Sequence, residues 1–340
     1  MQRPTIAIIS TVLNERESIR QLLDAFLRQS LRADEIVIVD GGSSDGTLDV
    51  LNAYAAEHRN VKFFVEPGVN IAQGRNIAIA RSHCDIVAVT DGGCRPVDGW
   101  LAALVQPLLN DPNYGAVTGV RNVESVNDFE FFAGKLSTSG NAANEEERVF
   151  HGRNSAFRKS VWLAAGGYPE WLYTAEDTLF AQRAKALGCK VAVAPEAVIS
   201  WRPRPNLKKL AKQYYLYGKG TGRIGQTDLN IVFYHLRNHV IWMLALLLGF
   251  GFFGFWLIAM AVLSFMFFTL VNPVITTLKR NNPDLRPSYW FYVPVIVMVR
   301  SFCNNLGQLS GYWEYRGAGV FRDNLERYRS GDWKSPFIAG

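Results

Sequence analysis

Apolar and polar positions alternate along the first 100 residues in blocks that are typical of an α/β protein. Strand-like apolar runs are expected at residues 5–10, 36–39, 61–65 and 86–89, and helical apolar spacing at 17–29, 47–57 and 74–81. Strands and helices in alternation predict parallel strands joined by right-handed crossovers. Beyond Pro112 the pattern is less regular, and helices are expected at 155–166 and 177–188. Ser44 or Asp45 is the expected cap of the helix at 47–57.

Acidic residues stand where several of these apolar runs give way to turn residues. Asp40 ends one run, Asp91 ends another, and Glu176-Asp177 follow the short segment 173–175. Because the carboxyl ends of parallel strands meet at one edge of an α/β sheet, we expect these carboxylates to converge on a ligand-binding crevice. This arrangement favours an enzyme.

The second half of the chain is dominated by an apolar stretch. No charged side chain occurs from Val240 to Leu278, a run of 39 residues. As a helix this run would be roughly 58 Å long, against about 30 Å of bilayer hydrocarbon, so a helical hairpin is expected rather than a single span. A third apolar segment at 289–312 contains Arg300 and several amides, and is expected to lie in the membrane interface, with a third span as the alternative.

The net charge of +6 is concentrated beside this apolar stretch. Residues 200–237 carry eight basic side chains and one acid, and further basic groups follow the apolar run. Positive flanks favour the cytoplasmic side, so two spans would keep the catalytic part and a basic tail in the cytoplasm at the cell (inner) membrane. The start of the chain has no secretory-signal pattern, and the four cysteines form no disulfide framework. Nucleic acid is not an expected partner, because the excess charge abuts the membrane segment.

Several common α/β enzyme classes lack their signatures in this chain. A dinucleotide-binding domain needs a glycine-rich turn after the first strand, but residues 10–15 contain no glycine. The glycine-rich stretch at 218–222 matches neither the dinucleotide nor the P-loop pattern. There is no Gly-x-Ser-x-Gly motif, and the five histidines show no metal-ligand spacing.

Four motifs in order give a resemblance that covers residues 4–225. They are Thr11-Val12-Leu13-Asn14-Glu15, the turn Asp40–Thr47, the helix start Gly74-Arg75-Asn76, and Gly166-Gly167-Tyr168 followed by Glu176-Asp177. Together they resemble the family 2 glycosyltransferases, in particular membrane-attached enzymes of exopolysaccharide synthesis of the succinoglycan type. The resemblance implies a GT-A fold, which is a Rossmann-like α/β fold with a mixed sheet.

The resemblance also implies roles for the motif residues. Thr11, Glu15, Asp40 and Arg75 would hold the nucleoside of a nucleotide-diphosphate sugar. Asp177 would be the general base that deprotonates the acceptor hydroxyl during inverting transfer, and Glu176 would orient the acceptor or the base.

The metal motif departs from that of the family. The family's Asp-x-Asp reads Asp91-Gly92-Gly93 here, so its second carboxylate is absent. Asp91 would bind Mg²⁺ or Mn²⁺ together with water and diphosphate oxygens. Alternatively, cationic side chains neutralise the leaving diphosphate, with Arg95, Arg202, Arg204, Lys219 and Arg223 as candidates.

The strip at 201–220 lacks the Gln-x-x-Arg-Trp motif of processive synthases, which favours addition of a single sugar. Its tyrosines and cations suit a membrane surface, and Arg202, Arg204, Lys219 and Arg223 are expected to dock the diphosphate of a lipid-linked saccharide acceptor.

The expected domains are a catalytic domain at 1–225, a membrane region at 226–315 and a basic cytoplasmic tail at 316–340. Two other functions stay open. One is a polyprenyl-phosphate sugar synthase, and the other is a catalytically impaired nucleotide-sugar-binding membrane protein.

Overall fold

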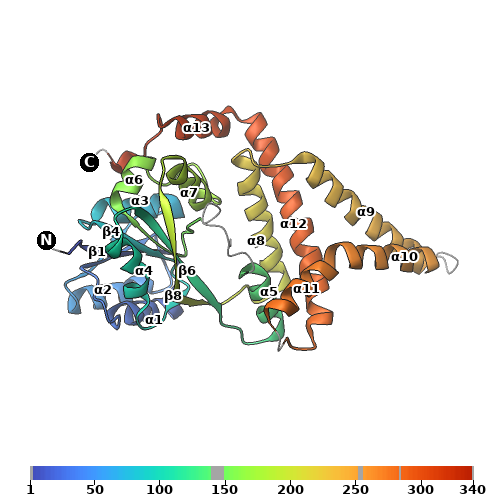
Figure 1. Ribbon diagram of the computed structural model, residues 1–340, viewed down its shortest axis with the longest axis horizontal. Coiled ribbons are helices and arrows are strands. Elements are labelled where there is room, and N and C mark those ends of the chain that lie inside the picture. The colour runs from blue at the N-terminus through green and yellow to red at the C-terminus, as the bar shows by residue number, and fades with distance from the viewer. Residues whose placement is uncertain (1–2, 139–148, 252–255, 283–284, 339–340) are drawn as a thin grey trace. The chain divides into compact units, whose positions relative to one another are not determined.

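The computed structural model describes residues 3–138, 149–251, 256–282 and 285–338 (Figure 1). Their contacts divide the chain into two compact units. The first unit comprises residues 1–122, 141–202 and 323–340, and the second comprises 123–140 and 203–322. The last residues of the chain therefore belong to the first unit, and the chain between residues 203 and 322 forms most of the second.

The first unit is built on a mixed sheet. Its described strands are β1 (Ile6–Val12), β2 (Glu35–Asp40), β3 (Val61–Val65), β4 (Ile86–Thr90), β5 (Cys94–Pro96), β6 (Tyr114–Val123), β7 (Asn154–Arg158) and β8 (Lys190–Trp201). They lie in the order β3-β2-β1-β4-β7-β6-β8-β5. The first four pair in parallel, as the strand–helix alternation predicts, whereas β7 runs antiparallel to β4 and to β6, and β5 runs antiparallel to β8.

Helices cover both faces of this sheet (Figure 1). They are α1 (Arg16–Leu27), α2 (Thr47–Glu57), α3 (Ile71–Arg81), α4 (Trp100–Asn110), α6 (Lys159–Ala165) and α7 (Glu176–Ala186). Successive residues of β1 point to opposite faces: Ile6 and Ile8 join one core with α1, α2 and α4, and Ala7 and Ile9 join the other with α3, α6 and α7. Because both faces are covered, the central strands read as continuous apolar runs.

Two expectations about local structure are wrong. The segment 155–166 is not one helix, because its first residues form β7, which inserts antiparallel between β4 and β6 and is buried there. Only residues 159–165 are helical. The N-cap of α2 is Gly46, at φ +93°, and not Ser44 or Asp45. Asp45 instead accepts a hydrogen bond from the backbone N–H of Thr47 inside the turn.

The second unit is helical in the part of the chain that the structure describes. Its elements are α5 (Asp128–Thr138), α8 (Leu207–Arg223), α9 (Leu229–Gly251), α10 (Trp256–Met266), the π-helix η3 (Phe267–Val271), α11 (Asn272–Asn281) and α12 (Tyr289–Gly317). The helix α13 (Gly319–Ser330) leads back into the first unit, which also contains the short 3₁₀ helix η4 (Pro336–Ile338). Among the described residues two segments, 229–248 and 262–281, are long and apolar enough to cross a membrane. The helical hairpin that the sequence predicts would also have two spans.

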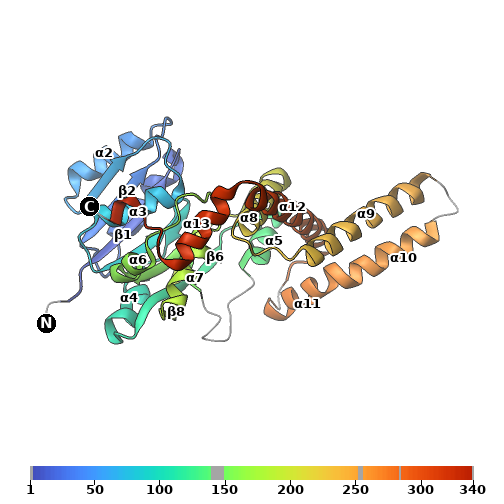
Figure 2. The ribbon, with the colours of Figure 1, turned by 90° about the horizontal axis from the view of Figure 1, so that it is seen from above.

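Glycines explain how closely α8 and α12 pack side by side (Figure 2). A Cβ atom at Gly218 would lie 2.0 Å from the backbone oxygen of Asn304, and one at Gly307 would lie 2.0 Å from that of Tyr215. One turn further along, a Cβ atom at Gly222 would lie 2.5 Å from the backbone oxygen of Gln308, and one at Gly311 would lie 2.1 Å from that of Lys219. Small residues spaced by four let two helix backbones touch. The glycine-rich stretch at 218–222 is therefore a packing surface.

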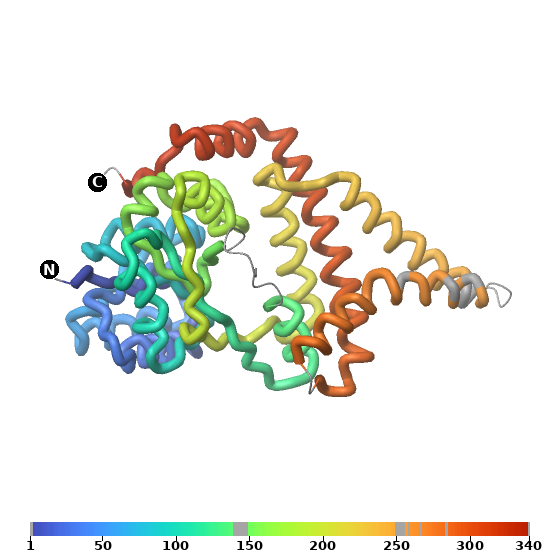
Figure 3. Tube along the Cα trace, in the orientation of Figure 1, coloured from blue at the N-terminus to red at the C-terminus, as the bar shows by residue number. Residues whose placement is uncertain are grey.

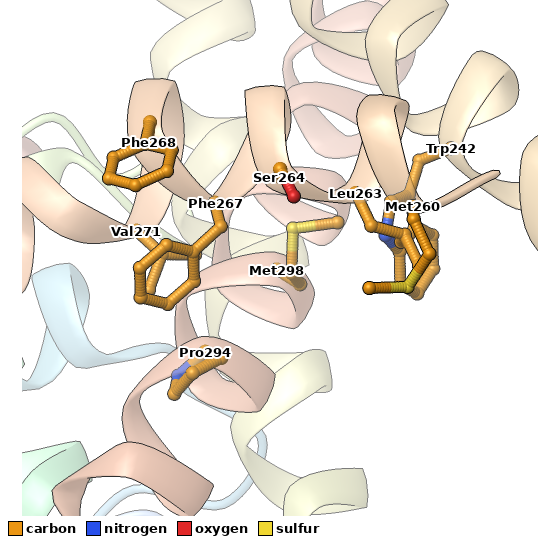
Figure 4. A pocket seen from close by; sticks show the side chains of 9 residues that line it. All are labelled: Trp242, Met260, Leu263, Ser264, Phe267, Phe268, Val271, Pro294 and Met298. Atoms are coloured by element: carbon orange, nitrogen blue, oxygen red, sulfur yellow. The ribbon is translucent and has the colours of Figure 1, made fainter. Parts of the chain in front are cut away.

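An apolar pocket of about 390 Å³ lies on the second unit (Figure 4). It is lined by residues of α9, α10, η3 and α12, among them Trp242, Phe267 and Met298. Phe267 and Phe268 come from the π-helix, whose wider turn interrupts the regular helix between α10 and α11. The lining suits hydrocarbon better than a polar ligand.

Candidate active site

Three acidic residues follow three neighbouring strands at their carboxyl ends. Glu15 follows β1, Asp40 ends β2 and Asp91 follows β4. Since β2, β1 and β4 are adjacent and parallel, these residues lie along one edge of the sheet, where Asp40 and Asp91 were expected. Glu176-Asp177, which were expected to follow an apolar strand-like run as well, instead begin α7 after a segment that is not a strand.

Asp40 has one carboxylate oxygen satisfied and one free. Its side chain is buried, and Oδ1 accepts hydrogen bonds from the backbone N–H groups of Gly42 (2.9 Å) and Ser43 (2.7 Å). Among the described residues Oδ2 has no hydrogen-bond partner. A buried carboxylate oxygen without a donor is costly, so Asp40 is poised to accept a hydrogen bond from a ligand.

The turns after β1 and β2 are locked together. Asn14, with φ +54°, accepts a hydrogen bond from the backbone N–H of Ser44 (2.9 Å). The N–H of Glu15 donates to Thr47 Oγ1 (2.9 Å), and the Glu15 carboxylate accepts from Ser18. These bonds fix the backbone of both turns at the edge where Asp40 stands.

Arg75, on α3, connects two of the acidic clusters. Its Nη1 lies 2.9 Å from Glu176 Oε1, and its Nη2 lies 2.9 Å from Asp91 Oδ1. The guanidinium lies over the ring of Tyr168, 5.4 Å from the centroid. Burial lowers the pKa of Arg75, but the carboxylates of Asp91 and Glu176 outweigh burial and raise it. The arginine is therefore a fixed positive charge at the centre of the acids.

A glycine makes room for this arginine. A Cβ atom at Gly152 would lie 2.4 to 2.5 Å from the guanidinium atoms of Arg75. The next residue, Arg153, places Nε 3.2 Å from Asp91 Oδ2 and its guanidinium 4.9 Å from the ring centre of Trp201. Both oxygens of Asp91 thus face arginines.

Glu176 and Asp177 begin α7, directly after a residue in a strained conformation. Ala175 has φ +68°, a left-handed conformation that costs a non-glycine residue about 1–2 kcal/mol. Glu176 is buried, whereas Asp177 is partly exposed. Asp177 accepts hydrogen bonds from the backbone N–H groups of Gly152 (3.1 Å) and Thr178 (2.7 Å).

The two carboxyl groups have opposite pKa shifts. Burial, followed by the neighbouring Asp177, raises the pKa of Glu176 to about 7. Burial would also raise the pKa of Asp177, but Arg75, His151 and the two N–H donors together lower it below its usual value. The more exposed acid is therefore the one that stays ionised, which suits a proton acceptor.

The other candidate residues have structural partners of their own. Thr11 lies on β1 against Gly74, whose added Cβ would meet the Thr11 methyl at 2.7 Å. Arg95 donates to Gln21, and Arg202, at the end of the first unit, is exposed. In the second unit Arg204 donates to Gln213, and both Lys219 (2.6 Å) and Arg223 (2.7 Å) pair with Glu314.

Sequence reasoning missed the segment His151-Gly152-Arg153. Each of its residues faces the acidic centre: burial lowers the pKa of His151 and the nearby Asp177 opposes this shift, Gly152 supplies an N–H to Asp177, and Arg153 pairs with Asp91. The signal was the strand that begins at Asn154, next to β4. β7 runs antiparallel to β4, and its first residue, Asn154, pairs with Thr90, the last residue of β4. A correct prediction of β7 would therefore have placed residues 151–153 next to Asp91.

The residues present make an incomplete divalent-metal site. In the described part of the chain, no group of three or more His, Cys, Asp or Glu side chains is arranged to hold a metal ion. Asp91 is the one carboxylate of the expected motif, and both of its oxygens are paired with arginines. A metal here would need most of its ligands from a diphosphate and water.

The sequence matches two family models and several known proteins. The model of the glycosyl transferase family 2 matches residues 7–163, and that of the glycosyl transferase family group 2 matches residues 101–302, more than half of the chain. The glycosyltransferase AglE of Haloferax volcanii is 26% identical over 236 residues, 66% of this chain and 75% of that protein. The succinoglycan biosynthesis protein ExoA of Rhizobium meliloti is 27% identical over 228 residues, 64% of this chain and 68% of that protein.

A solved structure is similar over nearly the whole chain. The mannosyltransferase PcManGT from Pyrobaculum calidifontis, in complex with GDP-Man and Mn²⁺, superposes with a TM-score of 0.59 at 20% sequence identity. The match covers 92% of this chain and 88% of that one. This likeness confirms the expected GT-A fold. The two family matches show that the chain belongs to glycosyltransferase family 2.

Proposed function

We propose that this protein is an inverting glycosyltransferase that moves one sugar from a nucleotide-diphosphate sugar to a lipid-linked saccharide at a membrane. The observation that carries the proposal is the pair of unlike carboxyl groups at the start of α7. Asp177 is ionised and partly exposed, while Glu176 is buried against Arg75.

The chemistry assigned to Asp177 is a single displacement. The acceptor hydroxyl gives its proton to the Asp177 carboxylate while its oxygen forms a bond to the anomeric carbon. The bond from that carbon to the diphosphate oxygen breaks, and the nucleoside diphosphate leaves with the electron pair. Attack opposite the leaving group inverts the anomeric configuration.

The nucleoside is assigned to the edge formed by Thr11, Glu15 and Asp40. The unpartnered Oδ2 of Asp40 supports this assignment, because a ribose or base donor would satisfy it. The mannosyltransferase of similar fold was solved with a nucleotide sugar, GDP-Man. Arg75, although assigned to the nucleoside by motif, has partners that favour a role in holding Asp91 and Glu176 in place.

Neutralisation of the leaving diphosphate is assigned to the neighbourhood of Asp91. A bound Mg²⁺ or Mn²⁺ would stabilise the departing charge there, and Mn²⁺ is present in the similar mannosyltransferase. Arg153, beside Asp91, is the cationic alternative. Titrating transfer against a chelator separates the two: loss of activity that is restored by added Mg²⁺ or Mn²⁺ supports the metal, and full activity in excess chelator removes it.

Membrane attachment is assigned to the segments 229–248 and 262–281. The chain leaves the first unit at Arg202 and returns to it by residue 323. If the first unit lies wholly on one side, the chain between these points crosses an even number of times. This supports two spans with α12 in the interface. The basic flanks of the apolar run favour a cytoplasmic catalytic unit. The division at 1–225, 226–315 and 316–340 stays a proposal from the sequence, and it differs from the two compact units at 203–225 and at 323–340.

Docking of the acceptor diphosphate is assigned to Arg202, Arg204, Lys219 and Arg223. Because Lys219 and Arg223 also pair with Glu314, charge reversal at Lys219 alone would break a structural contact. Lys219→Gln tests docking more cleanly, because glutamine can still donate a hydrogen bond to Glu314 and the Arg223–Glu314 pair stays intact. If Lys219 serves only α8–α12 packing, transfer stays near the wild-type level; if it docks the acceptor, transfer to lipid-linked acceptor falls while donor binding is normal.

The proposed function is tested with purified full-length protein and a panel of nucleotide sugars. Membranes or detergent micelles are supplied separately with polyprenyl phosphate and with polyprenyl-diphosphate saccharide, and the products are weighed by mass spectrometry. A single-sugar increment on the saccharide supports the proposal. Transfer to polyprenyl phosphate alone would identify a sugar synthase, and donor binding without transfer to either would identify an impaired binding protein.

A further inference from the structure

The last residues of the chain pack against the loop that precedes the acid pair. The segment 323–338 belongs to the first unit and lies beside the C-terminal end of α6 (Figures 1 and 3). The sequence predicts a basic cytoplasmic tail here, yet Leu325 and Tyr328 are buried. This segment, residues 323–338, is called the C-terminal clasp below.

Three hydrogen bonds attach the clasp to residues 166–170. The hydroxyl of the buried Tyr328 donates to the backbone oxygen of Gly167 (2.7 Å). The backbone N–H of Ser335 donates to the oxygen of Gly166 (2.8 Å), and its hydroxyl donates to the carboxylate of Glu170.

The two glycines of this loop are shaped for the clasp. Gly166 and Gly167 have φ of +86° and +88°, which favour glycine. A Cβ atom at Gly166 would lie 2.7 Å from the backbone oxygen of Trp333, and one at Gly167 would lie 3.0 Å from Ser335 Cβ. Any larger residue at Gly166 would therefore push the clasp away.

Asn76 ties the same loop to the helix that carries Arg75. Its Nδ2 donates to Tyr168 O and Glu170 Oε1 (both 2.8 Å), and its Oδ1 accepts from Tyr168 N (2.8 Å). Glu170 thus receives hydrogen bonds from Asn76 and from the clasp residue Ser335 through the same oxygen.

Tyr168 completes the connection to the acidic centre. Its ring lies under the guanidinium of Arg75 and 4.3 Å from the ring of Phe180 on α7, centre to centre. The clasp therefore contacts a loop whose central residue packs on both α7 and the arginine that pairs with Glu176 and Asp91.

We infer that Tyr328 and Ser335 are positioning residues for glycosyl transfer, which hold Tyr168 against Arg75 and so fix the arrangement of Asp91, Glu176 and Asp177. The inference rests on the proposed function for its kinetic consequence. The geometry of the active centre would then depend on the clasp, which follows the second unit in the chain.

The experiment compares full-length Tyr328→Phe/Ser335→Ala with wild type. Phenylalanine keeps the buried ring, so the variant loses the two side-chain hydrogen bonds to residues 166–170 without removing a large side chain. It also loses the hydrogen bond that Ser335 accepts from the backbone N–H of Phe337 within the clasp. Ser330→Ala is the matched control, because Ser330 lies in the same segment but is exposed and bonds only to its neighbours Arg327 and Asp332. Loss of positioning by fractions of an ångström is expected to lower kcat about 10-fold or more. The Kd for nucleoside diphosphate is expected to stay within about twofold, because the loop bonds that are removed go to Gly167 and Glu170, whereas the nucleoside is assigned to Thr11, Glu15 and Asp40.

A second readout does not require activity. Hydrogen–deuterium exchange of residues 166–180 is expected to rise in Tyr328→Phe/Ser335→Ala and to stay at the wild-type level in Ser330→Ala. If the exchange of residues 166–180 rises in the double variant but neither the wild type nor the variants transfer sugar, the proposed function is wrong, while the contact between the clasp and this loop is confirmed. Wild-type kcat and exchange in the double variant, with an active wild type, would overturn the inference.

Discussion

The Arg75 guanidinium and the Glu176 carboxylate form a buried ion pair at 2.9 Å, although the residues lie 101 positions apart in the chain. The same guanidinium reaches Asp91, so one cation joins the end of β4 to the start of α7. Because removal of one partner leaves the other buried and charged, this pair couples the fold to the active centre.

Replacing Arg75 by methionine keeps much of the side-chain volume but removes the charge. We expect the free energy of unfolding to fall by about 3 kcal/mol, because Glu176 and Asp91 lose their common partner. The rate of sugar transfer should fall about 100-fold, because Asp91 and Glu176 lose the positive charge that holds them in place. The control is Arg81→Met, in the last turn of the same helix, where the arginine lies over Phe64. Equal effects of the two substitutions on transfer would contradict a special role for Arg75.

Stability should depend on pH through Glu176. Its pKa is raised from 4.5 unfolded to about 7 folded, so its protonated form stabilises the fold fully below pH 4.5, and this contribution is lost as the pH rises through about 7. From pH 4.5 to 8, the free energy of unfolding of the wild type should therefore fall by on the order of 3 kcal/mol relative to that of Glu176→Gln. Thermal unfolding of both forms in the same detergent measures it. Asp177, whose pKa is lowered, acts with the opposite sign and only toward pH 3.8 and below.

Close helix packing predicts a sharp difference between two glycines of α12. Gly307→Ala places a Cβ 2.0 Å from the backbone of α8, whereas Gly317→Ala meets nothing within 4 Å. The first substitution should destabilise the protein by about 2 kcal/mol, because overpacking forces the helices apart. The second should change little. Melting temperatures of the purified variants decide this, and a tolerated Gly307→Ala would mean that α8 and α12 pack less closely.

The strained residue before the acid pair predicts a stabilising substitution. Ala175→Gly removes the cost of a left-handed alanine at φ +68°, and should raise the free energy of unfolding by about 1 kcal/mol. Ala186→Gly, at the exposed last position of the same helix, should instead lower it by about 0.5–1 kcal/mol. If both substitutions destabilise to the same extent, Ala175 is not strained.

The features that could be predicted from the sequence are those set by local apolar patterns and by the ends of strands. The alternation in the first 100 residues placed β1 to β4 and their helices correctly, and Asp40 and Asp91 stand at the strand ends where they were expected. The apolar run between Val240 and Leu278 overlaps both described segments that are long and apolar enough to cross a membrane, 229–248 and 262–281, and the number of spans stays a prediction.

Long-range contacts could not be predicted in the same way. β7 is a strand only because β4 and β6 pair with it on both sides, and its sequence alone reads as the start of a helix. The sequence of the clasp resembles that of a polar tail. Two of its apolar residues, Leu325 and Tyr328, are buried in the folded protein, and the local sequence does not show what covers them. The glycine-rich stretch at 218–222 matched no ligand-binding pattern, and no other role was predicted for its glycines. The spacing of four between Gly218 and Gly222 matches that between Gly307 and Gly311 on α12. Comparing glycine spacings between helices would have revealed this packing.

The role of Asp177 as the proton acceptor is tested most directly by measuring sugar transfer and donor binding in Asp177→Asn. The amide keeps the size of the side chain but cannot accept the proton of the acceptor hydroxyl. We expect kcat to fall about 10³-fold, with the Kd for nucleotide sugar unchanged. Transfer by Asp177→Asn within a few-fold of wild type would contradict this role, because the proton would then have another acceptor.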